Sequence, residues 1–419
     1  MTFLRALVGD RTANATVFVA MMSLLLIGAA GAASDTIQWT LLKRKLQRQA
    51  DSAALSGAMA RMSGGSVTAA ANAEIARYTA ITLQGSPTIE NAPSTGAYAG
   101  NAMAVRVKVT ANASLPFSQI FLGSAATMTA ESTAMAVGNG DYCVLALETI
   151  DATGIKVSGN ATATLGCGMA TNAQGTKAIE VTGSSTVTAT SLMAVGNISV
   201  NGNGSIGSTA LLPYALVQSD PFASLPTPAV PTGCTTRLRV NPNETLAVAN
   251  PTGTACYAEM DLKGTVTFAP GIYILNGGDL KLNATADVSG TGVVFILTSD
   301  QIVSNPSSVA NLSINGGARF NVSAPTSGAY AGIFLYQDRR AADDSGTNDV
   351  SGNSTSFMQG TIYFPAQRIK FTGNSGMNTN CLQIVARRVE FTGSNTVTNT
   401  CPANSGAGSF SGYQVRLVN

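Results

Sequence analysis

Hydrophobic positions are most concentrated near the start of the chain, where residues 15–33 (ATVFVAMMSLLLIGAAGAA) form 19 consecutive positions without a charge. At 1.5 Å of rise per residue this run spans roughly 28 Å as a helix, about the thickness of the hydrocarbon core of a bilayer. A helix satisfies its backbone hydrogen bonds internally, so it can cross lipid. The pattern therefore predicts a single transmembrane helix.

A cleavable signal peptide is the alternative, because Arg5 could supply its basic region and the small residues 29–33 its cleavage site. Two features argue against removal. The apolar run is longer than a usual signal core, and a helical pattern continues beyond it. We therefore expect the helix to be retained.

Beyond the apolar run, hydrophobic and small residues recur at helical spacing. They are Ile37, Leu41, Leu42, Leu46, Ala50, Ala53, Ala54 and Gly57, while Lys43, Arg44, Lys45, Arg48 and Asp51 fall mostly on the opposite side. This predicts a transmembrane and extended helix over residues 1–62. Its stripe of small residues could admit another helix at close range, or it could pack on the next domain of the same protein. The only tryptophan, Trp39, falls past the apolar run, where an interfacial indole is expected.

A repeated phrase organises the C-terminal two thirds: apolar, any residue, apolar, then Ser, Thr or Asn, and commonly Gly. Copies begin at Ile155 (IKVSGN), Ile179 (IEVTGS), Ile198 (ISVNGN), Leu280 (LKLNAT), Ile369 (IKFTGN) and Val389 (VEFTGS). Adjoining copies start 24, 19 and 20 residues apart (155 to 179, 179 to 198, 369 to 389). A short strand and a Gly/Asn turn in each such period are what the stacked coils of a parallel β-helix require. An antiparallel β-sandwich is the alternative fold.

Longer apolar runs supply further strands of this solenoid. Their expected core residues are Phe268, Ile272, Ile274, Val294, Ile296, Ile333, Leu335, Ile362 and Phe364. Residues 211–233 contain five prolines and interrupt the period, so they predict a long excursion on the surface. The expected fold is mainly β with a long N-terminal helix: the helix at 1–62, a small α+β domain at 63–138 and a β-helix-like domain at 139–419.

All six cysteines follow the apolar run: Cys143, Cys167, Cys234, Cys256, Cys381 and Cys401. Their even number favours an oxidising compartment and three disulfides, for which fifteen pairings are formally possible. Successive pairs are separated by 24, 22 and 20 residues, which is about one period, so consecutive pairing would join neighbouring coils at disulfide distance. The chain has neither a CxxC motif nor a histidine, so we expect no metal site and no cofactor.

Charge is sparse, at 11% of the residues with a net charge of +2, and gives no electrostatic case for nucleic acid binding. The basic run 43–48 could touch anionic lipid or form a solvated helix face. Two basic residues precede the apolar run and four follow it within about 20 residues, which by the positive-inside rule favours a cytoplasmic C-terminus. The cysteines favour the opposite orientation. We give the cysteines more weight, because six cysteines spaced as pairs would be more unusual in a cytosolic domain than one exception to the positive-inside rule.

The lack of histidine excludes Ser/His/Asp and Cys/His nucleophilic sites. Glycan-cleaving β-helices work with clustered carboxylates, so the densest charged segment is a candidate site. It contains Asp338, Arg339, Arg340, Asp343, Asp344 and Asp349, which we treat as a candidate binding loop. The spacing does not fit an EF-hand, and a solvated loop is the default interpretation.

The segment DRTANATV at 10–17, the acidic Asp35 and LQRQADSAALSGA at 46–58 resemble the N-terminus of TadG-like proteins of the tight-adherence (Tad/Flp) pilus assembly system of bacteria. In that family an RRGN sequence is followed by a membrane helix, an acidic residue and LQxAADAAALAGA. Residues 103–137 also resemble the family, with two strand-like segments around PFSQIFLG. The chain departs from the pattern at Ala13, where Gly is usual. A prepilin-type cut after Gly9 would leave Asn14 where pilins carry Glu, so no such processing is expected.

The resemblance implies a pilin-like domain at 63–138 and a single-pass protein of the bacterial inner membrane with a periplasmic or extracellular C-terminal domain. It implies other Tad pilus proteins as partners of the N-terminal helix. We expect a non-enzymatic, minor-pilin-like or assembly subunit whose exported β-helix is a structural or adhesive head, directed to a glycan or to a host or abiotic surface. A membrane-anchored polysaccharide-active enzyme is the alternative, and a scaffold that never leaves the inner membrane is a third possibility.

Overall fold

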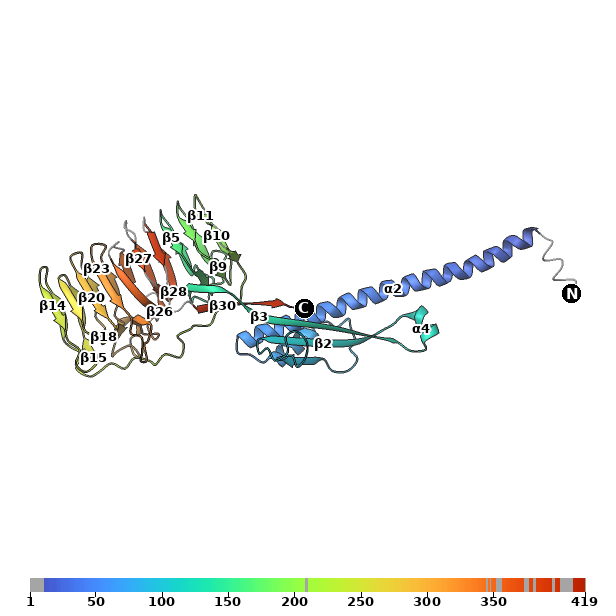
Figure 1. Cartoon of the computed structure of the whole chain (residues 1–419), viewed down its shortest axis with the longest axis horizontal. Coiled ribbons are helices and arrows are strands. Elements are labelled where there is room, and N and C mark those ends of the chain that lie inside the picture. The colour runs from blue at the N-terminus through green and yellow to red at the C-terminus, as the bar shows by residue number, and fades with distance from the viewer. Residues whose placement is uncertain are drawn as a thin grey trace. The chain divides into compact units, whose positions relative to one another are not determined.

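The computed structural model describes residues 11–207, 210–343, 346, 348–351, 356–372, 377–379, 382–393, 396–399 and 410–418. The chain divides into two compact units. The first is Met1–Val137 with Val415–Asn419, and the second is Gly138–Gln414. Figure 1 shows the helices in the first unit and stacked short strands in the second.

The first unit is built on helix α2 (Arg11–Met62), which confirms the long helix expected from the sequence. It continues with α3 (Val67–Ala76), β1 (Thr88–Asn91), β2 (Ala104–Ala113), α4 (Pro116–Leu122) and β3 (Ala126–Ala146). Strand β2 pairs antiparallel with β1 and with residues 126–135 of β3. Helix α4 therefore lies at the end of a β2–β3 hairpin.

The C-terminal half of α2 packs on this sheet. Its fully buried side chains belong to one core with Val105 and Val107 and are Leu46, Ala50, Ala53, Ala54 and Ala58. A Cβ added at Gly57 would lie 3.0 Å from Cγ1 of Val105, so the small residues bring helix and sheet close together. Of the two expectations for the small-residue stripe, another helix or the next domain of the same protein, the second is therefore correct.

The second unit is a parallel β-solenoid of about 11 turns, which confirms the predicted β-helix and excludes the antiparallel sandwich. After β3, its elements are β4 (Ile155–Val157), β5 (Thr162–Leu165), β6 (Gly168–Thr171), β7 (Ile179–Val181), β8 (Thr186–Thr188), β9 (Ser191–Ala194), β10 (Ile198–Val200), β11 (Ser205–Ile206), β12 (Ala210–Leu212), β13 (Arg237–Val240), β14 (Thr245–Val248), β15 (Thr254–Tyr257), β16 (Glu259–Leu262), β17 (Thr265–Phe268), β18 (Gly271–Asn276), β19 (Leu280–Leu282), β20 (Asp287–Thr291), β21 (Val293–Thr298), η1 (Pro306–Ser308), β22 (Leu312–Ile314), β23 (Arg319–Ser323), β24 (Ile333–Gln337), β25 (Asn348–Ser351), β26 (Phe357–Thr372), β27 (Met377–Thr379), β28 (Leu382–Phe391), β29 (Thr396–Asn399) and β30 (Phe410–Leu417).

The strands stack into three faces. Face 1 follows the order β12, β9, β6, β3, β28, β26, β24, β21, β18, β15. Face 2 follows β10, β7, β4, β28, β26, β25, β22, β19, β16, β13. Face 3 contains β11, β8, β5, β29 and β27, and then β26, β23, β20, β17 and β14.

The stacking order is a circular permutation of the chain order. The chain enters the stack in its middle at β3 and winds to one end at β12. It then resumes at the opposite end, at β13 to β15, and winds back until β28 pairs with β3 and β4 and β29 pairs with β5. The first and last coils are thus neighbours, which the repeat spacing in the sequence did not reveal.

Stacked glycines explain the Gly of the repeated phrase. Gly393, Gly159, Gly183 and Gly202 have φ angles of 89°, 76°, 77° and 65°. A Cβ at Gly183 would lie 2.7 Å from the carbonyl oxygen of Gly159, and one at Gly159 would lie 3.1 Å from the backbone of Gly393. Each corner therefore requires both the left-handed conformation and the missing side chain. This stack of glycines continues without interruption across the junction between the last and first coils.

Apolar side chains fill the inside of the coils and also cover the outside of face 1. Of the predicted core residues, Phe268, Leu335, Ile362 and Phe364 belong to the inner core. Ile274, Val294, Ile296 and Ile333 are buried in a separate outer cluster, with Ile272 at its edge. Strand β21 is buried at all of its residues because it is covered on both sides.

Two disulfides agree with the expected consecutive pairing. Cys143 is bonded to Cys167 with Cα atoms 5.7 Å apart, and this bridge joins the neighbouring coils that contain β3 and β6. Cys234 is bonded to Cys256 of β15 with Cα atoms 5.3 Å apart. Cys234 precedes β13, so this bridge ties the end of the proline-rich excursion to the terminal coil. Cys381 and Cys401 lie outside the described residues.

Candidate functional site

Exposed apolar side chains cover the N-terminal half of α2. They are Phe18, Val19, Met21, Met22, Leu24, Leu25, Leu26 and Ile27. The helix from Phe18 to Met62 is long and apolar enough to cross a membrane. Contact with water would make this surface unfavourable by about 25 cal/mol for each Å² of apolar area, and lipid removes that cost. This half of α2 therefore fits a membrane anchor.

Helix α4 is fixed against α2 at the end of the apolar run. The ring of Phe117 occupies the space that a side chain at position 31 would take, so Gly31 admits the ring. One turn along α2, the carboxylate of Asp35 accepts hydrogen bonds from the backbone N–H of Ser118 at 2.5 Å and of Phe117 at 3.4 Å. Asp35 is only 5% exposed, and its negative charge suits the first turn of α4. The sequence had marked Asp35 as an acidic residue of the resemblance without predicting this capping role.

A groove of about 310 Å³ adjoins this contact. Its lining includes Ala32, Thr36, Trp39, Leu115 and Met128, from α2 and the hairpin. Trp39 is 53% exposed. Farther along α2, Lys43, Arg44, Lys45 and Arg48 are exposed, which is compatible with both interpretations of the basic run.

The proline-rich excursion runs along face 1, and we call residues 213–236 the strap. Its backbone N–H at Ala215 donates to the carbonyl of Ala194 at 2.9 Å. Gln218 and the side chain of Asn172 exchange two hydrogen bonds, of 2.7 and 2.8 Å. Farther on, Phe222 packs edge-on against Tyr363 with ring centroids 5.3 Å apart. The predicted surface excursion is therefore an ordered cover over the outer apolar cluster.

The candidate binding loop holds the strap. The guanidinium of Arg339 donates to the carbonyls of Phe222, Ala223 and Leu225 at 2.6–3.3 Å, and that of Arg340 donates to the carbonyl of Pro228 at 3.1 Å. These donors satisfy four backbone carbonyls of the strap. A ligand-binding role for the loop stays a prediction.

We call Asp338, Arg339 and Arg340, with their contacts to the strap, the clasp. Asp338 is fully buried in it, so a solvated loop was the wrong expectation for this residue. Its carboxylate accepts from Nη2 of Arg340 at 2.6 Å and from Oγ1 of Thr298 at 2.7 Å. Burial alone would raise the pKa of Asp338, but the hydrogen bonds from Arg340 and Thr298 hold that pKa below its ordinary value. The buried charge is thereby stabilised in its ionised form.

Among the other candidate residues, Asp343 belongs to a second group of ion pairs. Asp343 forms an ion pair of 2.9 Å with Arg387, and Arg387 and Arg388 also bind the buried Glu148 at 3.0 and 2.5 Å. Burial would raise the pKa of Glu148, but these arginines and two backbone N–H groups lower it. Asp349 lies on β25 in face 2, and Asp344 lies outside the described residues.

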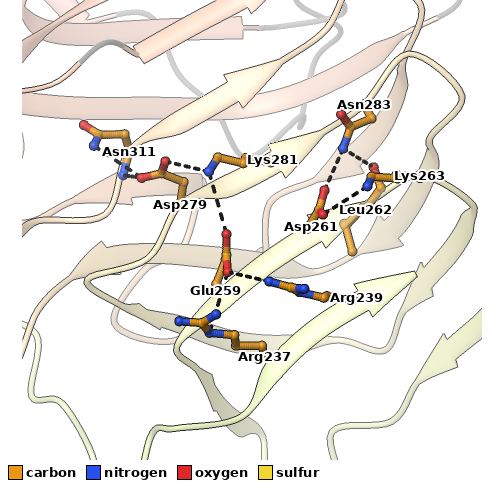
Figure 2. A network of polar contacts seen from close by, with 10 residues as sticks. All are labelled: Arg237, Arg239, Glu259, Asp261, Leu262, Lys263, Asp279, Lys281, Asn283 and Asn311. Atoms are coloured by element: carbon orange, nitrogen blue, oxygen red, sulfur yellow. Dashed lines mark hydrogen bonds and ion pairs between the residues drawn. The ribbon is translucent and has the colours of Figure 1, made fainter. Parts of the chain in front are cut away.

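Charged side chains cover the outside of face 2, and Figure 2 shows one end of this surface. Nζ of Lys281 lies 3.2 Å from Asp279 and 3.7 Å from Glu259. Glu259 in turn lies 3.7 Å from Arg237 and 3.6 Å from Arg239. Each carboxylate here is matched by a cation on its own coil or on the next one.

One outward row of face 2, which we call the charge ladder, has charged residues of alternating sign and serine at two positions. In register from strand to strand it reads Arg239, Asp261, Lys281, Ser313, Asp349, Lys370, Glu390, Lys156, Glu180 and Ser199. Opposite charges at neighbouring positions stabilise the register, and a one-coil error would bring like charges together. In the repeated phrase, the residue between the two apolar positions contributes to this row, and it is Lys, Glu or Ser. Within the described residues no group of three or more Cys, Asp or Glu side chains could hold a metal ion.

Comparison with known proteins identifies the N-terminal segment. Residues 13–60 match the family described as "Putative Flp pilus-assembly TadE/G-like". This match covers most of α2 and confirms the resemblance noted at 46–58. No curated protein and no solved structure matches the chain.

Proposed function

We propose that this chain is a membrane-anchored, non-enzymatic subunit of a Tad/Flp-type pilus system, and that its solenoid is an exported structural or adhesive head. The observation that carries this proposal is the TadE/G-like segment at residues 13–60 together with the exposed apolar surface of its first half. That surface supports insertion of α2 in the inner membrane as a single span.

The two disulfides support a solenoid outside the cytoplasm, because such bonds persist in oxidising compartments. Partner subunits would approach the membrane half of α2, since the small residues of its other half already pack on β2. At Gly28, within that half, no atom lies near enough to contact an added side chain. Close approach of a second helix at this level is sterically open.

Labelling of thiols in intact cells, with and without reductant, tests the export of the solenoid. We expect its cysteines to react only after reduction and from outside the inner membrane. Ready reaction from the cytoplasmic side without reductant would contradict the proposal. Copurification with sheared pili would separate a pilus subunit from a scaffold that stays in the membrane.

The non-enzymatic part is supported by the pairing of the carboxylates. A glycosidase needs two carboxylates that flank a bound sugar, whereas Asp338, Asp343 and Glu148 are each paired with arginine. We expect the purified protein to leave surface polysaccharides intact. Glycan cleavage that is lost in Asp343→Asn or Asp349→Asn, with surface attachment unchanged, would favour the enzymatic alternative.

A further inference from the structure

The tip of the β2–β3 hairpin has apolar side chains that the described part of the first unit leaves exposed. Ile120 and Phe121 of α4 are each 75% exposed. The Phe121 ring packs edge-on against that of Phe117, with centroids 5.3 Å apart. In water, two large adjacent apolar side chains at a loop tip are an unfavourable arrangement.

The position of α4 indicates what covers these side chains. Phe117 lies against Gly31, and Ser118 is bonded to Asp35, so α4 is held at the level where the apolar run of α2 ends. A helix of seven residues is only about 10 Å long, so all of α4 lies near that level. The headgroup regions add about 5–8 Å on each side of the hydrocarbon core, so a helix held at this level reaches the headgroup region.

The sequence of the tip is consistent with this location. From Val109 to Ala130 the chain carries no charged residue, although Lys108 and Glu131 flank the segment. A charge that reached the hydrocarbon core would be costly, whereas the Ser, Thr, Asn and Gln side chains present are tolerated among headgroups. The C-terminal half of α2 and its sheet carry the charges, away from the tip.

We infer that α4 is a second membrane contact, which inserts Ile120 and Phe121 into the interface of the bilayer beside α2. This inference rests on the proposed membrane-spanning role of α2. The occupant of the exposed face is lipid rather than a protein, because α4 is held at the end of the apolar run whose side chains are exposed on α2. The contact would fix the depth and rotation of α2, since α4 is held by both Gly31 and Asp35.

Single tryptophan reporters test the inference in the full-length protein. Trp39 is the only tryptophan, so a Trp39→Phe background accepts one reporter at a time. The reporters are Phe121→Trp at the tip, Leu25→Trp in the apolar half of α2 and Val303→Trp, which is 79% exposed, in the solenoid. Each variant is reconstituted in vesicles of phosphatidylcholine and phosphatidylglycerol that contain phosphatidylcholine brominated near the headgroup or near the chain end.

We expect bromines near the headgroup to quench the Phe121→Trp reporter, with emission at shorter wavelength than that of Val303→Trp. Bromines near the chain end should quench Leu25→Trp more strongly, and neither lipid should quench Val303→Trp. If lipid quenches Leu25→Trp but leaves Phe121→Trp like the solenoid reporter, the inference is wrong and the proposed anchor stands. If lipid quenches neither of these two reporters, the proposed anchor is wrong as well.

Discussion

Replacing Arg340 by alanine would test whether the buried clasp stabilises the solenoid. The variant removes the guanidinium that bonds to Asp338 at 2.6 Å and to the carbonyl of Pro228 at 3.1 Å. Asp338 has no exposed surface, so its charge would be left in a low-dielectric site without a counterion. The strap would also lose one of its attachments.

The expected loss follows from burial. Removing one partner of a buried ion pair costs about 3–5 kcal/mol. Arg340 is 34% exposed, and Thr298 and the backbone N–H of Arg340 still donate to Asp338, so part of this loss is compensated. We expect a loss of about 2 kcal/mol in the free energy of unfolding, which lowers the Tm of a unit of this size by about 4–8 °C.

Thermal unfolding of the full-length protein, followed by circular dichroism, measures this shift. Arg237→Ala is the matched control, because Arg237 is 63% exposed and its ion pair with Glu259 is 3.7 Å long. Surface pairs of this kind contribute about 0–1 kcal/mol. Equal Tm values for Arg340→Ala and Arg237→Ala would contradict the structural role of the clasp.

The dependence on pH gives a second, independent criterion. In the native protein the pKa of Asp338 is lowered from its ordinary value, so its pairing stabilises the fold above the ordinary pKa of an aspartate and is lost as the pH falls through the lowered pKa. Without Arg340, burial is less well compensated, so we expect the pKa of Asp338 to rise and its carboxyl to be protonated at higher pH than in the native protein. The difference in Tm between variant and native protein should therefore shrink as the pH is lowered. A difference that stays constant down to acidic pH would refute the electrostatic explanation.

Three further predictions concern the stack and use the same unfolding assay. Gly183→Ala places a methyl group 2.7 Å from the carbonyl of Gly159 and should cost about 2 kcal/mol or more, whereas Gly233→Ala, also at positive φ but in open space, should cost about 1 kcal/mol. Equal losses would show that stacking is not the cause. Changing Cys234 and Cys256 to Ser opens a loop of 22 residues and should cost about 3 kcal/mol, and an unchanged Tm would show that the bridge does not hold the terminal coil. Lys156→Glu, between Glu390 and Glu180 in the charge ladder, should cost about 1 kcal/mol more than Lys156→Gln. That excess should fall at high salt, and a salt-independent excess would exclude charge repulsion as its cause.

The sequence predicted those parts of the structure whose pattern is local and periodic. The apolar run, the helical spacing as far as Gly57 and the repeated phrase each indicate their element within a short window. The permuted order of the coils was not predictable in this way, because a repeat specifies which residues stack but not which copies are neighbours. The alternating charges of Lys156, Glu180 and Glu390 indicate which copies are neighbours only when the register of the strands is already known.

The candidate loop shows a second limit of sequence reasoning. Asp338, Arg339 and Arg340 stand out as charges in a weakly charged chain, and such a cluster most often indicates a solvated or ligand-binding segment. The partners of Arg339 and Arg340 are backbone carbonyls of the strap more than 100 residues away, and no side-chain pattern marks a carbonyl as an acceptor. For the same reason the hydrogen bonds from α4 to Asp35 could not be foreseen.

The permuted stack explains where the described disulfides lie. In a solenoid, each coil is stabilised mainly by its two neighbours. Here the first coil obtains one neighbour only when β28 and β29 arrive at the end of the chain. Cys143–Cys167 joins that first coil to the next one within 24 residues, so it can hold the early coils together before the last coil docks. Cys234–Cys256 does the same where the chain restarts at the opposite end after the strap. Both bonds therefore join coils at places where sequential winding is interrupted, and disulfides of this kind persist in oxidising compartments.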